Sequence, residues 1–492
     1  MDTNSGLTEA QAVKTIQKAY DLLAETNGGK ILLVSDYTHT MTASNQTIVT
    51  GDHSYEVVIT GKTAAAKLII HYAGTAYLGL RGPTTFENIT MNVSGSSNMT
   101  IFGNNGGLLK IGENVKTTSS TKLKLSAGPM KSGYNGPMSL EVNSGSWQDL
   151  FAGCYMYTLN GTGSLVMNGG SAVNVQTTYN GKHTGDLTIT VNGGTVTNLY
   201  GGARSTGTIN GNVTVNLNGG TIKTKWDADG AGTLNGKAIL NLGGHVTIGT
   251  GIRLNVTGAV TAPSVVTISG TPTYGTAYVT APAGSDILYS QGACTVSGTS
   301  YILDELKPQN ISLKYDDRKD LADLVGVTPV EVQISGEQVT SCKVGTTEAD
   351  DHVIIYENGK IYAVGTGTAT LTVNGTAHTV TVTPATISML MITGHSVGAG
   401  DGGNIGKSVV CEAGQVYSSH RPYSITSGEG GLGYGTEVRA ACKASDGSTV
   451  GIDNQQHLDA FTAEGIGTMG VKSLCNNADN ASLALISLFT TL

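Results

Sequence analysis

Residues 213–221 read VTVNLNGGT, in which apolar side chains alternate with Thr and Asn before two glycines and a threonine. Alternation with a period of two is typical of a β-strand that buries one face, and paired glycines favour a tight turn with positive φ. Related stretches occur earlier in the chain as ITVNGGTV, SLVMNGGSA and SLEVNSGSW. The strand and its turn are therefore predicted to be one unit of a repeat.

The turning glycine recurs every 24 to 26 residues, at Gly145, Gly170, Gly194, Gly220, Gly244 and Gly270. A unit of this length cannot bury its apolar face alone, so a tight period over six units predicts a solenoid of stacked units. Two or three short strands in about 25 residues are the content of one coil of a parallel β-helix. We expect roughly nine coils, which at about 4.8 Å per strand give a rod on the order of 40 Å long.

This repeat resembles the right-handed, pectate-lyase-like β-helix superfamily. It is more closely similar to the Gly-, Thr- and Asn-rich solenoids of gut-bacterial surface proteins, and the resemblance covers residues 30–300. It implies an all-β fold built on a right-handed parallel β-helix, and it implies no particular activity.

Asparagine occupies the same position in four successive coils, at Asn143, Asn168, Asn192 and Asn218. One interpretation is an internal ladder, in which each side-chain amide bonds to the next. The other is that Asn tolerates the left-handed backbone conformation beside Gly. The sequence leaves both interpretations open.

Alignment of the second strand of each coil predicts two columns of side chains. One column, expected in the core, contains Trp147, Ala172, Val196 and Ile222. The other contains Phe151, Gln176, Tyr200 and Trp226. Aromatic side chains that end a strand beside a turn can stack on sugar rings, while nearby Asn, Thr and Tyr groups bond sugar hydroxyls. The candidate glycan-binding residues are therefore Phe151, Tyr200 and Trp226; the alternative is that they pack beneath the adjoining turn.

Residues 1–29 predict an amphipathic helix. Thr8 and Gln11 form its expected capping box, and Asn27-Gly28 is its expected stop. We expect this helix to cap the open edge of the first coil, because an unprotected sheet edge pairs readily with other molecules.

Two regions follow the rod. Residues 306–384 contain longer strands and hairpin turns at ENGK and NGTA. Within them, residues 357–373 resemble the group-2 bacterial Ig-like module, which implies an Ig-like β-sandwich that acts as a spacer on an extracellular protein. Residues 385–492 are expected to form a small C-terminal domain, whose class the sequence leaves open, α/β included.

Composition excludes some classes of partner. The chain of 492 residues has 28 Lys and Arg against 36 Asp and Glu, a net charge of -8, and no basic run. This balance disfavours a nucleic-acid partner. No stretch of eighteen apolar residues occurs, so we expect no membrane span.

Candidate catalytic residues are few. Ser396 lies in GHSVG, a literal G-x-S-x-G, with Asp453 and His457 as the nearest triad partners. The sequence AGDGGNIGK that follows is a poor helix, which favours a strand-to-loop turn over the nucleophile elbow of an esterase.

Carboxylates are also few on the rod. Asp227 and Asp229 in WDADG are candidate calcium ligands. Together with Asp149 and Asp186 on other coils, they are the best candidates for an acid and a base in polysaccharide cleavage. No Lys or Arg stands at an obvious partner position in the sequence, and an isolated D-x-D-G is usually a loop turn.

Three functions fit these patterns. We expect a non-catalytic protein, extracellular or on a cell surface, that presents its rod for adhesion or for binding a host or cell-surface polysaccharide. This function needs no cofactor, with calcium at the WDADG aspartates as the one considered. The first alternative is a phage tail fibre or spike, which would be a homotrimer in the virion. The second is a polysaccharide lyase or carbohydrate esterase.

Overall fold

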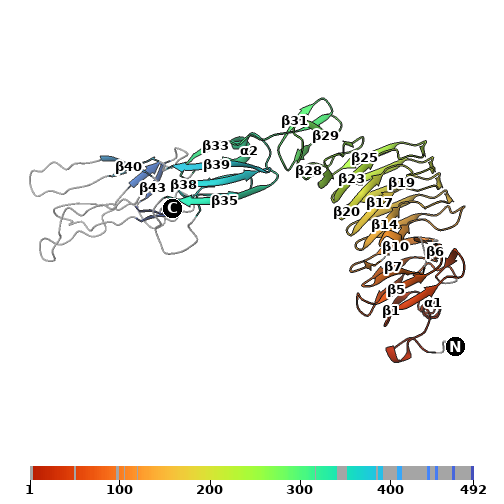
Figure 1. The fold of residues 1–492 in the computed structure, drawn as a ribbon. Helices are drawn as coiled ribbons and strands as arrows, with labels where there is room; N and C mark the ends of the chain where they lie inside the picture. The colour runs from red at the N-terminus through yellow and green to blue at the C-terminus, as the bar shows by residue number, and fades with distance from the viewer. Residues whose placement is uncertain are drawn as a thin grey trace, which may run out of the picture. The chain divides into compact units, whose positions relative to one another are not determined.

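A computed structural model describes residues 4–48, 51–95, 99–104, 106–118, 120–315, 317–340 and 352–383, together with six strands beyond residue 385 (Figure 1). The described chain is nearly all β, as the sequence predicts, and its two α-helices are short. Neither helix has the length and apolar character of a membrane-crossing segment. The chain divides into two compact units, residues 1–305 and 306–492.

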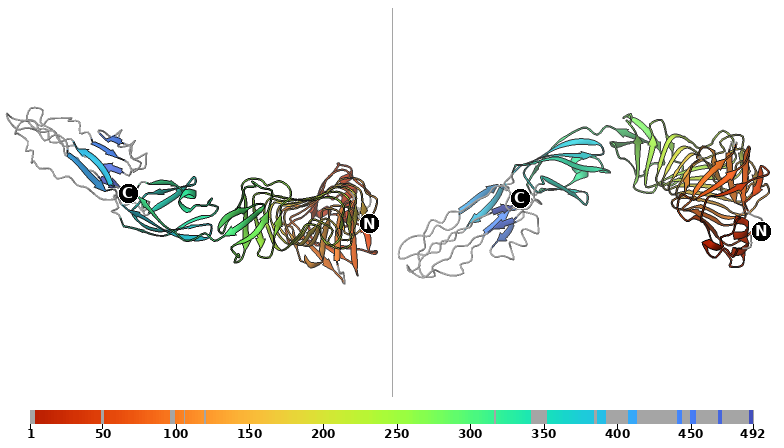
Figure 2. Two further views of the ribbon diagram at one scale, coloured as in Figure 1. Left: turned by 90° about the horizontal axis from the view of Figure 1, so that it is seen from above. Right: turned by 60° about the horizontal axis from the view of Figure 1, so that its bottom comes forward.

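The first unit contains a right-handed parallel β-helix, whose strands stack side by side in Figures 1 and 2. Its first sheet consists of β1 (Gly29–Leu33), β4 (Val57–Gly61), β7 (Thr84–Glu87), β10 (Gly107–Ile111), β13 (Met138–Val142), β16 (Gly163–Met167), β19 (Leu187–Val191), β22 (Val213–Leu217) and β25 (Ala238–Leu242). Its second sheet consists of β3 (Asn45–Thr47), β6 (Thr75–Leu80), β9 (Met99–Asn104), β12 (Leu123–Ser126), β14 (Ser146–Phe151), β17 (Ser171–Gln176), β20 (Thr195–Tyr200), β23 (Thr221–Asp227), β26 (His245–Gly249), β28 (Ser264–Ser269) and β30 (Ile287–Tyr289).

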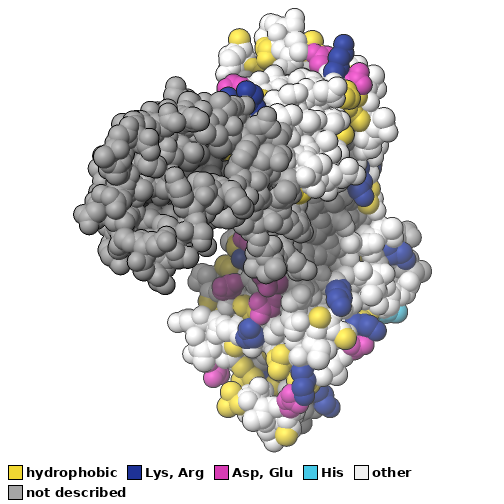
Figure 3. Space-filling model, turned by 90° about the vertical axis from the view of Figure 1, so that its left-hand side faces the viewer, with side chains coloured by type: hydrophobic (Ala, Val, Ile, Leu, Met, Phe, Trp, Pro, Cys, Tyr) yellow, Lys and Arg dark blue, Asp and Glu magenta, His cyan; other side chains and the backbone are white. Residues whose placement is uncertain are grey.

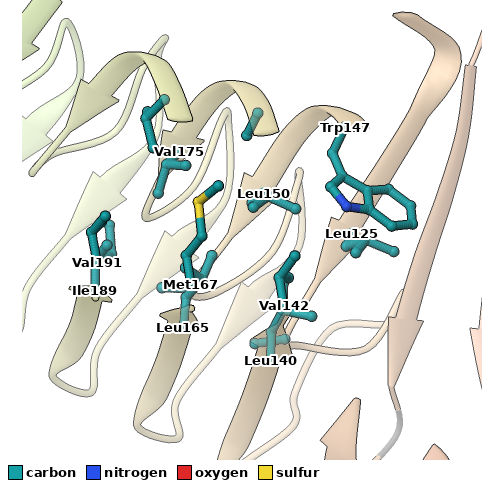
Figure 4. Packing of buried hydrophobic residues seen from close by; sticks show 14 of the residues in the cluster. Leu125, Leu140, Val142, Trp147, Leu150, Leu165, Met167, Val175, Ile189 and Val191 are labelled. Carbon is teal, nitrogen blue, oxygen red and sulfur yellow. The ribbon is translucent and has the colours of Figure 1, made fainter. Parts of the chain in front are cut away.

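The register of the first sheet confirms the predicted period. Gly163 pairs with Leu187, Leu187 with Val213, and Val213 with Ala238 in parallel strands. Apolar side chains of β13, β16 and β19 fill the space opposite those of β14 and β17 (Figure 4). Full burial of each Val, Leu or Ile side chain stabilises the coil by about 1.5–3 kcal/mol. The column expected in the core is buried, with Trp147, Ala172, Val196 and Ile222 at most 4% exposed.

The cross-section of the coil changes near residue 143. In the first four coils a third strand follows the first sheet, forming a sheet of β2 (Tyr37–Thr40), β5 (Lys67–His71), β8 (Thr90–Ser94) and β11 (Lys116–Thr117). From β13 onward the third strand instead follows the second sheet, as β15 (Thr158–Leu159), β18 (Lys182–His183), β21 (Thr208–Ile209) and β24 (Thr233–Leu234). The long connection therefore moves from one corner of the coil to another.

The corner that loses this connection becomes the tight turn seen in the sequence repeat. Only residues 192–194, for example, separate β19 from β20. Gly194 has φ of 80°, and a Cβ there would lie 2.6 Å from the carbonyl oxygen of Gly170. The stacking of one corner on the next therefore requires glycine at this position.

The asparagines at this corner form the predicted ladder, although on the solvent side. Amide nitrogens of Asn168, Asn192 and Asn218 each donate to the Oδ1 of the Asn one coil earlier, at 2.8, 2.8 and 2.9 Å. All three donors belong to exposed residues. The ladder is therefore external. The last residue of the preceding strand points into the core, and the corner turns the Asn side chain that follows it toward solvent.

The N-terminal segment packs on the first coil, with a different start from the predicted one. Helix α1 (Ile16–Ala24) begins at Thr15, whose side chain accepts a hydrogen bond from the Lys18 amide, and it buries Ile16 and Tyr20. Thr8 instead precedes the 3-10 turn η1 (Glu9–Gln11) and makes no side-chain capping bond. The predicted stop is confirmed, since Asn27 has φ of 55° and the Gly28 amide donates to Leu23.

Four further strands close the other end of the coil. They are β27 (Leu254–Asn255), β29 (Thr276–Thr280), β31 (Ala293–Ser297) and β32 (Ser300–Asp304). β32 pairs antiparallel with both β29 and β31, so the parallel stacking ends there. Within the coil, a short 3-10 turn, η2 (Ser120–Lys122), precedes β12.

The second unit begins with two sheets. One consists of β33 (Asn310–Lys314), β39 (Thr376–Thr383), β38 (Gly367–Val373) and β35 (Val332–Val339), and the other of β34 (Arg318–Asp320), β37 (Lys360–Ala363) and β36 (Ile354–Glu357), with α2 (Leu321–Val325) after β34. The hairpins predicted at ENGK and NGTA are present, with positive φ at Asn358 and Asn374.

Beyond residue 385 the structure describes two small sheets. They contain β40 (Thr386–Met391), β41 (Lys407–Glu412), β42 (Ala440–Lys443) and β43 (Thr449–Ile452), and β44 (Thr468–Gly470) with β45 (Phe489–Thr491). The candidate catalytic residues Ser396, Asp453 and His457 lie outside the described residues.

Candidate functional site

The predicted aromatic column lies at the ends of strands in the second sheet, and its first member is covered. Phe151 pairs with Gln176 in β17, as the alignment of the strands predicts. Both side chains are fully buried. The ring of Tyr155, in the connection after β14, packs edge-on against Phe151 with 5.8 Å between centroids. Phe151 therefore packs beneath the adjoining connection, which is the alternative that the sequence allowed.

Trp226 lies outside the column in which the alignment places it. β23 has one extra residue relative to β20, and the resulting irregularity puts Trp226 beside Leu199 and Asp227 beside Tyr200. The Trp226 indole is partly buried against the core, and its Nε1 donates to Asn255 Oδ1 at 2.8 Å. The structure thus separates Trp226 from Tyr200, although both lie near the end of the same sheet.

A different row of side chains runs along the coil axis at this place. It comes from three strands of the second sheet, β12, β20 and β23, and from the connections that follow β14, β17 and β20, so that it spans five consecutive coils. At the spacing of β-strands it is on the order of 20 Å long. We call this row the aromatic–cation ladder, and it consists of Lys124, Tyr155, Tyr179, Arg204, Tyr200 and Lys225.

The rings and cations of the ladder are stacked on one another. The rings of Tyr155 and Tyr179 are parallel within 2°, with centroids 5.1 Å apart. Lys124 Nζ lies 5.3 Å from the Tyr155 centroid. The Arg204 guanidinium lies between two rings, 5.7 Å from the centroid of Tyr179 and 5.9 Å from that of Tyr200. Each such cation–π contact stabilises the row by about 0.5–1 kcal/mol where it is partly exposed.

The far end of the ladder is held by an ion pair. Lys225 Nζ lies 5.0 Å from the Tyr200 centroid and 2.8 Å from Asp227 Oδ2. The hydrogen bond to Asp227 raises the pKa of Lys225, so this ammonium stays charged at neutral pH. Tyr200 is only 9% exposed, because cations lie over its ring.

A buried carboxylate anchors the middle of the ladder. Asp149 is 1% exposed, and its Oδ1 accepts from the Arg204 Nη1 at 3.0 Å and from the Asn174 amide at 2.6 Å. Its Oδ2 is paired with Lys124 Nζ. A charge so deeply buried must be paired and hydrogen-bonded, and the two cations that pair with it are thereby fixed in position. Sequence reasoning missed both partners: Lys124 stands one period, 25 residues, before Asp149, and Arg204 lies 55 residues after it.

Two tyrosine hydroxyls of the ladder are open to a ligand. Tyr155 and Tyr179 are half-buried, and none of the described residues is hydrogen-bonded to either hydroxyl. Burial raises the pKa of the Tyr155 hydroxyl, so it remains a donor at neutral pH. Since the ring faces are covered by neighbours in the stack, the ladder offers ring edges, hydroxyl groups and cations.

Sequence reasoning missed Tyr155, Tyr179 and Arg204 because they lie in connections rather than strands. The signal that could have found them is their common offset: each stands three or four residues after the last residue of its strand in successive coils. Backbone bonds align these connections, since the Asn180 amide donates to Tyr155 and the Ser205 amide to Tyr179.

The candidate carboxylates are not gathered into one site. Asp227 accepts from the Gly230 amide at 2.9 Å in addition to its ion pair with Lys225, and Asp229 is exposed in the same turn. Asp186 lies on another connection, where it accepts from the Asn212 amide at 2.7 Å. Across the described ranges, no three His, Cys, Asp or Glu side chains come together as a metal site would require.

One face of the described residues is mostly uncharged. In Figure 3 the visible face of the described residues is largely white, the colour of backbone and of polar uncharged side chains, with scattered basic and acidic groups.

A comparison of the chain with models of protein families, with curated proteins and with solved structures finds no match. The comparisons thus add no family to the β-helical fold, and the geometry of the aromatic–cation ladder is the basis on which a function can be proposed.

Proposed function

We propose that this protein is a non-catalytic, extracellular rod that binds a carbohydrate through the aromatic–cation ladder. The observation that supports this most is the alignment of Tyr155, Tyr179 and Arg204 at equivalent places of three successive coils. A linear glycan also repeats its groups at regular intervals, so a row of donors along the rod can contact several sugar units at once.

The chemistry of the ladder suits a polyhydroxylated ligand. Hydroxyl and guanidinium groups bond sugar oxygens, and ring edges contact the apolar faces of sugars. The exposed Asn180 lies beside Tyr179 and already bonds Thr206 on the next coil, so amide and hydroxyl groups border the row.

The rigidity of the site favours binding. Its backbone is bonded to the coils before and after it, and its side chains are stacked or ion-paired. A preorganised surface loses little conformational entropy when a ligand binds. This compensates for the modest affinity that a shallow glycan site usually provides.

The carboxylates near the ladder are occupied in ways that favour binding over cleavage. Both oxygens of Asp149 are bonded to Lys124, Arg204 and Asn174. Asp227 is paired with Lys225. An acid and a base that cleave a glycosidic bond must be free to exchange protons, whereas these two groups hold cations in place.

The proposal is tested with a variant carrying both Tyr155→Ala and Tyr179→Ala on a glycan array. We expect retention on the glycans that bind the unchanged protein to fall roughly tenfold or more, because two aromatic contacts of about 0.5–1.5 kcal/mol each are lost. Tyr274→Ala is the matched control, since Tyr274 is a 40% exposed tyrosine of the same unit outside the ladder. Retention that is equal in both variants would refute the proposal.

A further inference from the structure

We infer that the ligand of the ladder is an anionic polysaccharide, whose sulfate or carboxylate groups bind Arg204. This inference rests on the proposed function and adds the charge of the ligand. It follows from the excess of cations over carboxylates around Asp149 and from the N–H groups of Arg204 that are not bonded to described residues.

The charge balance around the ladder is opposite to that of the chain. The whole chain has a net charge of -8, whereas residues 122–230 contain seven Lys and Arg against five Asp and Glu. Lys182 and Lys223 are exposed in this part of the coil, and among the described residues no Asp or Glu is ion-paired with either. An anion is therefore attracted to this part of the rod.

Asp149 does not neutralise the cations that surround it. One carboxylate faces two cations, Lys124 and Arg204. The Lys124 side chain is 12% exposed, whereas that of Arg204 is 32% exposed. The surplus positive charge is therefore presented to solvent chiefly at Arg204.

The Arg204 guanidinium is prepared for an oxyanion. Its Cζ lies over the rings of both Tyr179 and Tyr200, and its Nη1 is bonded to Asp149. Among the described residues, Asp149 is the one acceptor bonded to this side chain. The remaining N–H groups form part of a planar fork, which matches carboxylate and sulfate oxygens and is more weakly hydrated than an ammonium group.

The neighbouring hydroxyl completes this site. Tyr179 stands beside Arg204 in the stack, and its hydroxyl is free of bonds to described residues. A charged oxyanion gains more from such a donor than a neutral sugar hydroxyl does, because hydrogen bonds with one ionised partner are about twice as strong. The ladder therefore discriminates in favour of an acidic glycan.

The test compares dextran, dextran sulfate and carboxymethyl dextran, three polymers with one backbone, by titration calorimetry on the full chain. We expect both anionic polymers to bind more tightly than dextran, and the better of the two to identify the preferred oxyanion. Arg204→Gln should weaken this binding roughly 10- to 100-fold, because a hydrogen bond to a charged group is lost. Arg204→Lys should recover part of it by restoring charge without the fork.

Arg253→Gln is the matched control. Arg253 also lies over a tyrosine ring, 4.4 Å from the Tyr278 centroid, but outside the ladder. Equal losses in both variants would show non-specific attraction and would overturn the inference, as would an absence of binding to both anionic polymers. If glycans on the array are still retained by the ladder tyrosines, the proposed function stands and only the charge of the ligand is wrong. If no glycan is retained either, both fail.

Discussion

Two reactive side chains, Cys154 and His183, meet inside the coil beneath the connections that carry the ladder. The Cys154 Sγ lies 3.5 Å from His183 Nε2, and both residues are fully buried. Burial raises the pKa of the Cys154 thiol to about 12 and lowers that of His183 to about 4. The pair is therefore neutral. The His183 imidazole has room beside Cys154 because Gly153 has no Cβ; a Cβ there would lie 2.3 Å from the imidazole Nε2.

His183 predicts acid sensitivity of the coil. Its pKa is lower in the folded state than the unfolded value of 6.5, so between about pH 6.5 and 4 the unfolded chain binds more protons. The free energy of unfolding should therefore decrease as the pH falls through this range, by roughly 3 kcal/mol at pH 4. Among the described residues, His183 Nδ1 has no hydrogen-bond partner, so an added proton would have no acceptor.

Thermal unfolding followed by circular dichroism at pH 7 and pH 4 measures this effect. His183→Gln should reduce the difference between the two melting temperatures. His71→Gln, at an exposed histidine, should leave the difference unchanged. The assignment to His183 is wrong if both variants behave like the unchanged protein.

At the level of the element, the external asparagine ladder shows how a corner can add stability without contributing to the core. An inner amide both donates and accepts along the stack, so Asn192 makes two bonds to its neighbours, whereas Asn218, the last of the row, only donates and makes one. The bonds connect positions that the backbone already holds in register. They therefore reinforce the corner where the chain has only three residues in which to turn.

This arrangement predicts graded effects of substitution. Asn192→Ala should lower the free energy of unfolding by roughly 1–2 kcal/mol, and Asn218→Ala by about half as much, since hydrogen bonds contribute about 0.5–1.5 kcal/mol each. Urea unfolding of the two variants provides the comparison. Equal losses would mean that the side-chain bonds contribute nothing beyond the turn conformation.

Across the whole first unit, the ends of the rod differ in how they are closed. β32 closes one end by antiparallel pairing. At the other end, β1 and β3 are terminal strands of their sheets, and the N-terminal segment packs over the first coil. A groove of about 770 Å³ lies between them, and Leu32 beside it is 46% exposed. The N-terminal segment is therefore the main protection of this edge.

Deleting residues 1–28 should cause self-association. The deletion uncovers the backbone edge of β1 and the apolar residues beneath α1, and such edges pair with other molecules. Light scattering should show higher oligomers for this variant. Deletion of residues 1–14, which leaves α1 in place, should preserve the oligomeric state of the full chain; association of both variants to the same extent would contradict the capping role of α1.

The all-β coil, its period and its buried column could be predicted because stacking places residues 24 to 26 apart directly beside one another. The positions of Val213, Ala172 and Gly194 follow from this periodicity and from the preferences of apolar side chains and glycine. The start of α1 was misplaced because Thr8 and Thr15 are both plausible caps, and packing of Ile16 and Tyr20 on the first coil selected the second.

The repeat alone therefore specifies the coil and the residues that stack between coils. The three-dimensional fold was needed to establish that the Asn corner faces solvent, that Phe151 is buried, that Trp226 is displaced and that the ladder assembles around Asp149. The physical reason is that a repeat specifies neighbours one period apart, whereas these features depend on the path of irregular connections. An ion pair between Asp149 and Arg204, 55 residues apart, depends on that path and leaves no periodic trace in the sequence.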